Sequence, residues 1–196
     1  MASPLPIDVR LEAAAQLVLR SRIFYDIWAY FEGADTRLAI IDTMRIYNEF
    51  FRFAPHAHFV AFIVQTAALF DRHKGTISLP HLLQEMKTDD LISAQDAAVV
   101  DSLISQAKPF TRSIAILRNK AFAHRSDDIS YDDVFKMAAV TARQLRELTE
   151  TALNIANCLL VARGRSEKFF NELPQNDAEA TLKALGRIAK ASDQHG

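Results

Sequence analysis

The stretch Leu117-Arg118-Asn119-Lys120-Ala121-Phe122-Ala123-His124-Arg125 combines an arginine, a histidine and a run of sequence without acidic residues. Between residues 102 and 126 there is no Asp or Glu, whereas elsewhere acidic and basic residues are mixed almost evenly. The basic residues of this acid-free stretch are Lys108, Arg112, Arg118, Lys120 and Arg125. Because the formal net charge of the chain is only -1, this positive charge is local, and it indicates a site for an anion.

The same stretch also predicts the fold. Phe110, Ile114, Leu117 and Ala121 are apolar and follow one another at intervals of three or four residues. This spacing is typical of an α-helix with one face in the core, so the basic residues lie on another face.

Apolar spacing of three to four residues continues through most of the chain and predicts an all-α fold, a helical bundle with long antiparallel helices. The predicted helices cover about 8–31, 35–53, 56–72, 79–86, 94–106, 130–162 and 178–191. The helix over 94–106 continues into the basic stretch or bends at Pro109. Pro55 is expected to separate two helices, and the helix over 130–162 is expected to be close to 50 Å long at roughly 1.5 Å per residue.

Composition is that of one ordinary globular domain, with 49% hydrophobic and 24% charged residues. Residues 1–7 are predicted to be a flexible N-terminus, 8–163 the bundle, and 164–196 a polar extension with one weak helix. Cys158 is the single cysteine, which excludes an intrachain disulfide and fits a reducing compartment. No secretory signal is evident, and the longest apolar run is too short to span a bilayer, so we expect a cytoplasmic protein without membrane contact.

Arg118 and His124 admit two interpretations. If the segment is α-helical, they are about 120° apart around the axis and roughly 9 Å apart along it. A histidine at a helix C-terminus can simply bond the last carbonyl groups, and exposed basic residues are usually only solvated. Alternatively, an imidazole can take the proton from a ribose 2′-hydroxyl, while a guanidinium holds the phosphate and stabilises the charge that develops on it.

The stretch resembles the signature of the HEPN superfamily (higher eukaryotes and prokaryotes nucleotide-binding), an Arg followed after four to six residues by a His. Arg118, Asn119, Ala123 and His124 match this signature. The wider chain resembles the AbiU-type, abortive-infection branch, in which segments like Ala68-Leu69-Phe70-Asp71 and Ser78-Leu79-Pro80-His81-Leu82-Leu83 follow each other. The likeness covers about residues 10–160.

The resemblance implies a helical bundle that forms a homodimer, and a metal-independent endoribonuclease that acts in phage defence or in a toxin–antitoxin pair. It implies catalytic roles for His124 as general base or acid, Arg118 as phosphate ligand, and Asn119 as a positioning group. Lys120, Arg125 and Arg112 are then expected to bind RNA or a nucleotide phosphate. An antitoxin or another protein partner is a further expectation. The alternative is a non-catalytic HEPN module that binds a partner or a nucleotide.

Other groups of residues in the sequence give less support for a functional site. His56 and His58 are two residues apart and point to different sides of a helix, and no Cys or carboxylate cluster joins them, so we predict no metal and no cofactor. The carboxylates between Asp127 and Asp133 are explained by the start of a helix. No Gly-rich phosphate loop is present.

Overall fold

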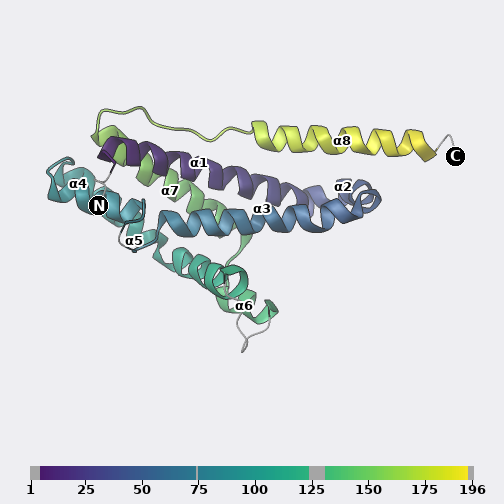
Figure 1. The fold of residues 1–196 in the computed structure, drawn as a ribbon, viewed down its shortest axis with the longest axis horizontal. Helices are drawn as coiled ribbons and strands as arrows, with labels where there is room; N and C mark the ends of the chain where they lie inside the picture. The colour runs from purple at the N-terminus through teal and green to yellow at the C-terminus, as the bar shows by residue number, and fades with distance from the viewer. Residues whose placement is uncertain (1–4, 74, 124–130, 194–196) are drawn as a thin grey trace. The chain divides into compact units, whose positions relative to one another are not determined.

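The computed structural model describes residues 5–73, 75–123 and 131–193, and over these ranges it contains helices and no strand (Figure 1). The all-α prediction is confirmed. The elements are α1 (Ile7–Glu32), α2 (Ala34–Ile46), α3 (Asn48–Leu69), α4 (Leu79–Thr88), α5 (Ala94–Ile116), η1 (Leu117–Ala123), α6 (Tyr131–Ala138), α7 (Ala142–Ala162) and α8 (Leu173–Asp193).

The chain divides into two compact units. The first unit comprises residues 1–21 and 63–169, and the second comprises 22–62 and 170–196. Helices α1 and α3 each contribute residues to both units.

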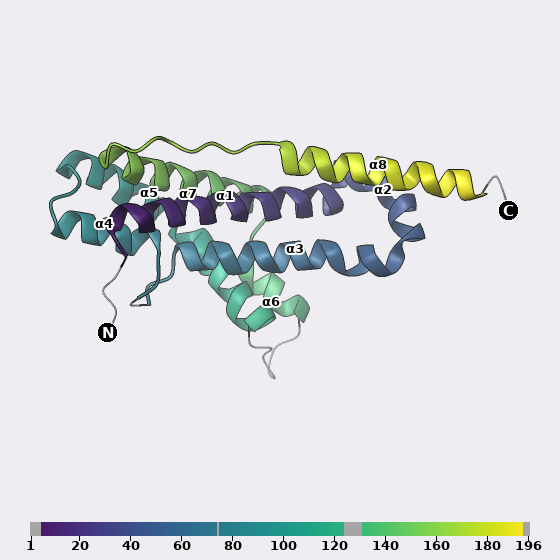
Figure 2. The same cartoon turned by 45° about the horizontal axis from the view of Figure 1, so that its top comes forward.

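Packing of α5 against α7 forms the centre of the first unit, and both views show these helices close together (Figures 1 and 2). From α5, Val100 and Ile114 are buried, and from α7 Leu148 and Ile155 have no more than 2% of their surface exposed. Ala152 and Ala156 are also buried on α7, and such small side chains let a neighbouring helix approach closely. The face of α5 that packs in the core is therefore apolar, and its basic residues lie on another face, as the apolar spacing predicts.

The ends of several helices are set by local sequence signals. The hydroxyl of Ser93 accepts a hydrogen bond from the backbone N–H of Asp96 at 3.1 Å, and Ser93 thereby caps the N-terminus of α5. Pro80 lies in the first turn of α4, where its missing N–H costs no hydrogen bond. Gly164 follows α7 with a φ of +65°, a conformation that glycine adopts without strain.

The prediction of one long helix over 130–162 is wrong, because α6 ends at Ala138 and α7 begins at Ala142. Ala139 has a φ of +45°, which an α-helix cannot contain. Thr141 then forms a capping box with Gln144, in which each side chain accepts from the other residue's backbone N–H. The predicted cap Ser130 lies outside the described residues.

The predicted boundary at Pro55 is also wrong. Helix α2 ends at Ile46, and Pro55 lies inside α3, which begins at Asn48. Gly33, not Asp35 or Thr36, is the N-cap of α2. A side chain at Gly33 would place its Cβ 2.6 Å from the carbonyl oxygen of Ala29, so only glycine fits this close approach.

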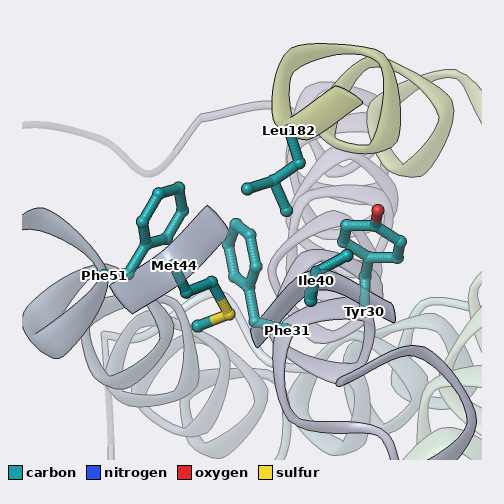
Figure 3. Close-up of a cluster of buried hydrophobic side chains, with 6 residues drawn as sticks. All are labelled: Tyr30, Phe31, Ile40, Met44, Phe51 and Leu182. Atoms are coloured by element: carbon teal, nitrogen blue, oxygen red, sulfur yellow. The ribbon is translucent and has the colours of Figure 1, made fainter. Parts of the chain in front are cut away.

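In the second unit, α8 lies beside α2, and apolar side chains from both are buried together (Figure 2). Leu182 points from α8 towards Phe31 and Ile40 (Figure 3). The buried members of this cluster are Tyr30, Phe31, Ile40, Met44, Phe51 and Leu182. The two helices approach closely at Gly186, where an added Cβ would lie 2.9 Å from the hydroxyl of Thr43.

Candidate anion-binding site

A cavity of about 430 Å³ lies between the C-terminal end of α3 and the second half of α5, and we call it the basic cavity. Its charged lining residues are Asp71, Arg72, Lys108, Arg112 and Arg118. Four cations and one carboxylate thus converge on one hollow. All of these residues belong to the first unit.

Arg118 is held at this cavity by two side chains. Its Nη1 donates to Asp71 Oδ2 at 3.3 Å, and its Nε donates to Asn119 Oδ1 at 2.9 Å. The side chain of Arg118 is 30% exposed, so the guanidinium is oriented by the protein and still open to a ligand. An oriented, accessible guanidinium is what bidentate recognition of a phosphate requires.

Asp71 follows α3 and supplies the carboxylate that the basic stretch lacks. Burial raises the pKa of Asp71, but hydrogen bonds from the backbone N–H of His73 and from Arg118 outweigh burial, so the pKa is lower than usual. The N–H of His73 donates to Asp71 Oδ1 at 3.0 Å, which leaves Oδ2 for Arg118. Asp71 is therefore ionised at neutral pH and fixes Arg118 in place.

We predict that Asp71→Asn lowers the free energy of unfolding more at pH 7 than at pH 3. A carboxyl group with a lowered pKa in the folded state stabilises the fold above its unfolded pKa of about 3.9. That contribution is lost as the pH falls through the folded pKa. Urea unfolding of both proteins between pH 7 and pH 3 measures the difference.

Asp101→Asn is the matched control for this comparison, because Asp101 is 55% exposed and pairs with Lys87 on the surface. Its effect should be small throughout, since exposed ion pairs contribute about 0–1 kcal/mol. A loss of stability in Asp71→Asn that is equally large at pH 7 and pH 3 would contradict the role of the Asp71 charge.

Arg118 lies on a π-helix and not on an α-helix. Residues Leu117–Ala123 form η1, in which hydrogen bonds run from residue i to i+5. The estimate of 120° and 9 Å between Arg118 and His124 assumes an α-helix and does not apply to this segment. Such π-helical turns are rare and are frequently found at functional sites.

Apolar contacts fix η1 at both ends. Leu117 is fully buried, and the ring of Phe122 packs edge-on against Phe135 of α6, with 6.4 Å between the ring centres. The polar residues Arg118, Asn119 and Lys120 lie between these two anchors. The wide helical turn is therefore held by packing on α5 and α6.

The structure brings only part of the predicted site together. Arg112 and Arg118 line the basic cavity, while Lys120 is half-buried and is not among the described lining residues. Asn119 is not among the described lining residues, but its side-chain oxygen accepts a hydrogen bond from Arg118, which lines the cavity. His124 and Arg125 lie outside the described residues, directly after η1 in the sequence.

Asp71 and Arg72 were not predicted to be site residues, and Lys108 was counted only among the basic residues of the acid-free stretch. Asp71 and Arg72 come from the end of α3, far from the basic stretch in sequence, so spacing alone could not connect them. Lys108 belongs to the acid-free stretch, and its helical separation from Arg112 by four residues is the signal that could have placed both on one face.

A larger cavity of about 700 Å³ lies between α2 and α8 in the second unit. Positive and negative charges are more nearly balanced in its lining, which contains the acidic residues Asp35 and Glu179 and the basic residues Lys183, Arg187 and Lys190. Lys183 forms an ion pair with Glu179, whose hydrogen bond raises the pKa of Lys183. This cavity therefore has no comparable excess of positive charge.

The His56–His58 pair, considered above as a possible metal site, was the next candidate. The ring of His58 contacts the carbonyl oxygen of Ala54 through Nδ1 at 2.7 Å and packs beside Phe24 and Phe31. Within the described ranges, no three His, Cys, Asp or Glu side chains gather as metal ligands would. Among the helices described, none has the length and apolar character needed to cross a bilayer.

The described part of the chain is helical, and comparison with protein families identifies the family to which it belongs. The model of the HEPN family AbiU2 matches residues 6–182, which is most of the chain. This chain belongs to the AbiU2 family of abortive-infection HEPN domains. Neither curated proteins nor solved structures gave a significant match.

Proposed function

We propose that this HEPN domain cleaves RNA without a metal ion, and that Arg118 and His124 perform the reaction. The observation that supports the proposal is the placement of Arg118, held by Asp71 and Asn119 at the edge of a cavity with excess positive charge. A nuclease needs such a group to hold the scissile phosphate and to stabilise its transition state. Membership of the AbiU2 family of abortive-infection domains supports phage defence or a toxin–antitoxin pair as the setting.

In the proposed reaction the 2′-oxygen of ribose attacks the adjacent phosphorus and the bond from phosphorus to the 5′-oxygen breaks. The imidazole of His124 takes the proton from the 2′-hydroxyl, which an imidazole with a near-neutral pKa can do. The leaving 5′-oxygen receives a proton from an imidazolium. The products are a 2′,3′-cyclic phosphate and a 5′-hydroxyl, and the chain of events needs no metal.

We further propose that two copies of the chain act together, because a second His124 supplies the imidazolium that protonates the leaving group. Two acid-free stretches brought together would repel each other, and an anionic RNA backbone between them would offset this repulsion. Light scattering of the purified protein tests for the dimer.

The proposal predicts that the wild-type protein cleaves single-stranded RNA in the presence of EDTA and that His124→Ala does not. The ends of the products identify the chemistry, since terminal 2′,3′-cyclic phosphates are detected by mass spectrometry. His81→Ala, a histidine of α4 that does not line the basic cavity, is the control and should leave cleavage intact. Intact RNA after incubation with a correctly folded wild-type protein would favour the alternative, a HEPN module that binds a nucleotide or a partner without catalysis.

A further inference from the structure

The basic cavity offers more positive charge than one phosphate at Arg118 can use. Arg118 shares its charge with Asp71, the one carboxylate among the described lining residues. Arg72, Lys108 and Arg112 form no ion pair with described residues, and all three are exposed. Three cations without acidic partners in a hollow concentrate a positive potential there.

Two of the cations are spaced along α5. At roughly 1.5 Å per residue, Lys108 and Arg112 are about 6 Å apart along the axis of α5, and Arg118 follows where α5 ends. Successive charges on one strand of a duplex are about 3.4 Å apart along its axis, and an unstacked single strand is more extended. The row of cations therefore matches successive phosphates of one strand better than a single phosphate.

The uncharged part of the cavity lining suits the remainder of a nucleotide. It consists of the apolar residues Ala67, Phe70, Ile114 and Ala115 together with Thr66 and Thr111. Single-stranded RNA is commonly bound with its phosphates on basic side chains and its bases against aromatic or apolar ones. A volume of about 430 Å³ is within the range of cavities that hold small ligands.

We propose that the basic cavity is a second subsite, which holds the nucleotide next to the scissile bond of the RNA strand. Lys108 and Arg112 each bind a successive phosphate of the strand beyond the scissile one, Arg72 adds positive charge beside them, and Phe70 and Ala115 contact the sugar and base. The inference rests on the proposed function, since it takes the phosphate at Arg118 to be the scissile one. It makes the substrate a single strand of at least a few nucleotides and not an isolated dinucleotide.

The test is binding of a 2′-O-methyl RNA hexamer, which cannot be cleaved, to the wild type and to the double variant Lys108→Gln/Arg112→Gln. Fluorescence anisotropy at several salt concentrations gives the slope of log K against log[salt]. Each lost phosphate contact on a single strand should reduce the slope by about 0.7, so the double variant should lose about 1.4. Both side chains are exposed, so the fold should tolerate the changes.

Arg143→Gln/Arg146→Gln is the matched control, because it removes two exposed cations of one helix, α7, that do not line the cavity. Its slope should stay that of the wild type. An unchanged slope in Lys108→Gln/Arg112→Gln would overturn the subsite, and so would an equal decrease in both double variants.

Two further measurements separate this inference from the proposed function and from a free nucleotide as the ligand. Cleavage of unmodified RNA by the wild type is assayed in parallel, so a protein that cleaves but shows no change of slope loses only the subsite. Adenosine 5′-monophosphate is tested as a competitor of the hexamer. If it binds as tightly as the hexamer, the cavity is a site for a free nucleotide and the strand proposal is wrong.

Discussion

Replacing Arg118 with alanine should lower the rate of RNA cleavage by at least about a hundredfold, which is the usual loss when one transition-state donor is removed. Arg118 is the group that the structure orients most tightly at the basic cavity, through Asp71 on one side and Asn119 on the other. The guanidinium can donate two parallel hydrogen bonds to a phosphate while its remaining N–H groups keep these protein contacts. Alanine removes all of them.

Arg118→Lys should be nearly as inactive, because an ammonium group is a point charge and cannot reproduce the planar fork of donors. The measurement is the single-turnover cleavage rate at saturating RNA, which separates the chemical step from binding. Arg143→Ala serves as the control, since Arg143 is 88% exposed on α7 and pairs with Glu147 one turn away. A cleavage rate in Arg118→Ala within a few-fold of the wild type would remove Arg118 from the mechanism.

The general fold could be predicted because helix formation here depends on local sequence. The spacing of apolar residues marks both faces of α5, and Ser93, Pro80 and Gly164 mark helix ends as their backbone chemistry requires. Pro55 was the misleading signal, because it lies within α3 and does not separate two helices. Pro109 lies within α5, which continues past it, and this is one of the two alternatives that the sequence left open.

The geometry of the site could be predicted less well, since it depends on contacts between distant segments. Nothing in the sequence around Arg118 indicates that its carboxylate partner is Asp71, which is 47 residues earlier. The π-helix also leaves no clear pattern, because the apolar positions Leu117 and Ala121 fit an α-helix equally well. The tertiary contacts of Leu117 and Phe122 in this segment are likewise not readable from the spacing.

The capping box at Thr141 was visible in the sequence, as a threonine followed three residues later by Gln144. The apolar residues, however, keep their heptad spacing across the break from Phe135 to Leu145, and this spacing favoured a single helix over the capping signal. An apolar period alone therefore does not distinguish one helix from two helices that keep the same register.

Phe62→Ala should lower the free energy of unfolding by about 3–5 kcal/mol, the usual cost of removing a fully buried phenylalanine. Phe62 has no exposed surface, and its ring packs edge-on against Tyr25 with 5.5 Å between the ring centres. Phe59 lies next to it, and Trp28 stacks on Phe59 with 4.7 Å between their rings. Removing the Phe62 ring leaves a void among these aromatic side chains, and part of the cost is the cavity itself.

Phe53→Ala is the matched control on the same helix, because Phe53 is 60% exposed and contacts Arg52 on the surface. Its effect should stay within about 0.5 kcal/mol, as for most exposed positions. Trp28 is the single tryptophan of the chain, so its fluorescence during urea unfolding reports on the packing around Phe62 directly. A large decrease in the urea midpoint of unfolding for Phe62→Ala alone would show that burial on one face of α3 stabilises the second unit. Equal urea midpoints for the two variants would show that the aromatic cluster of α1 and α3 does not stabilise it.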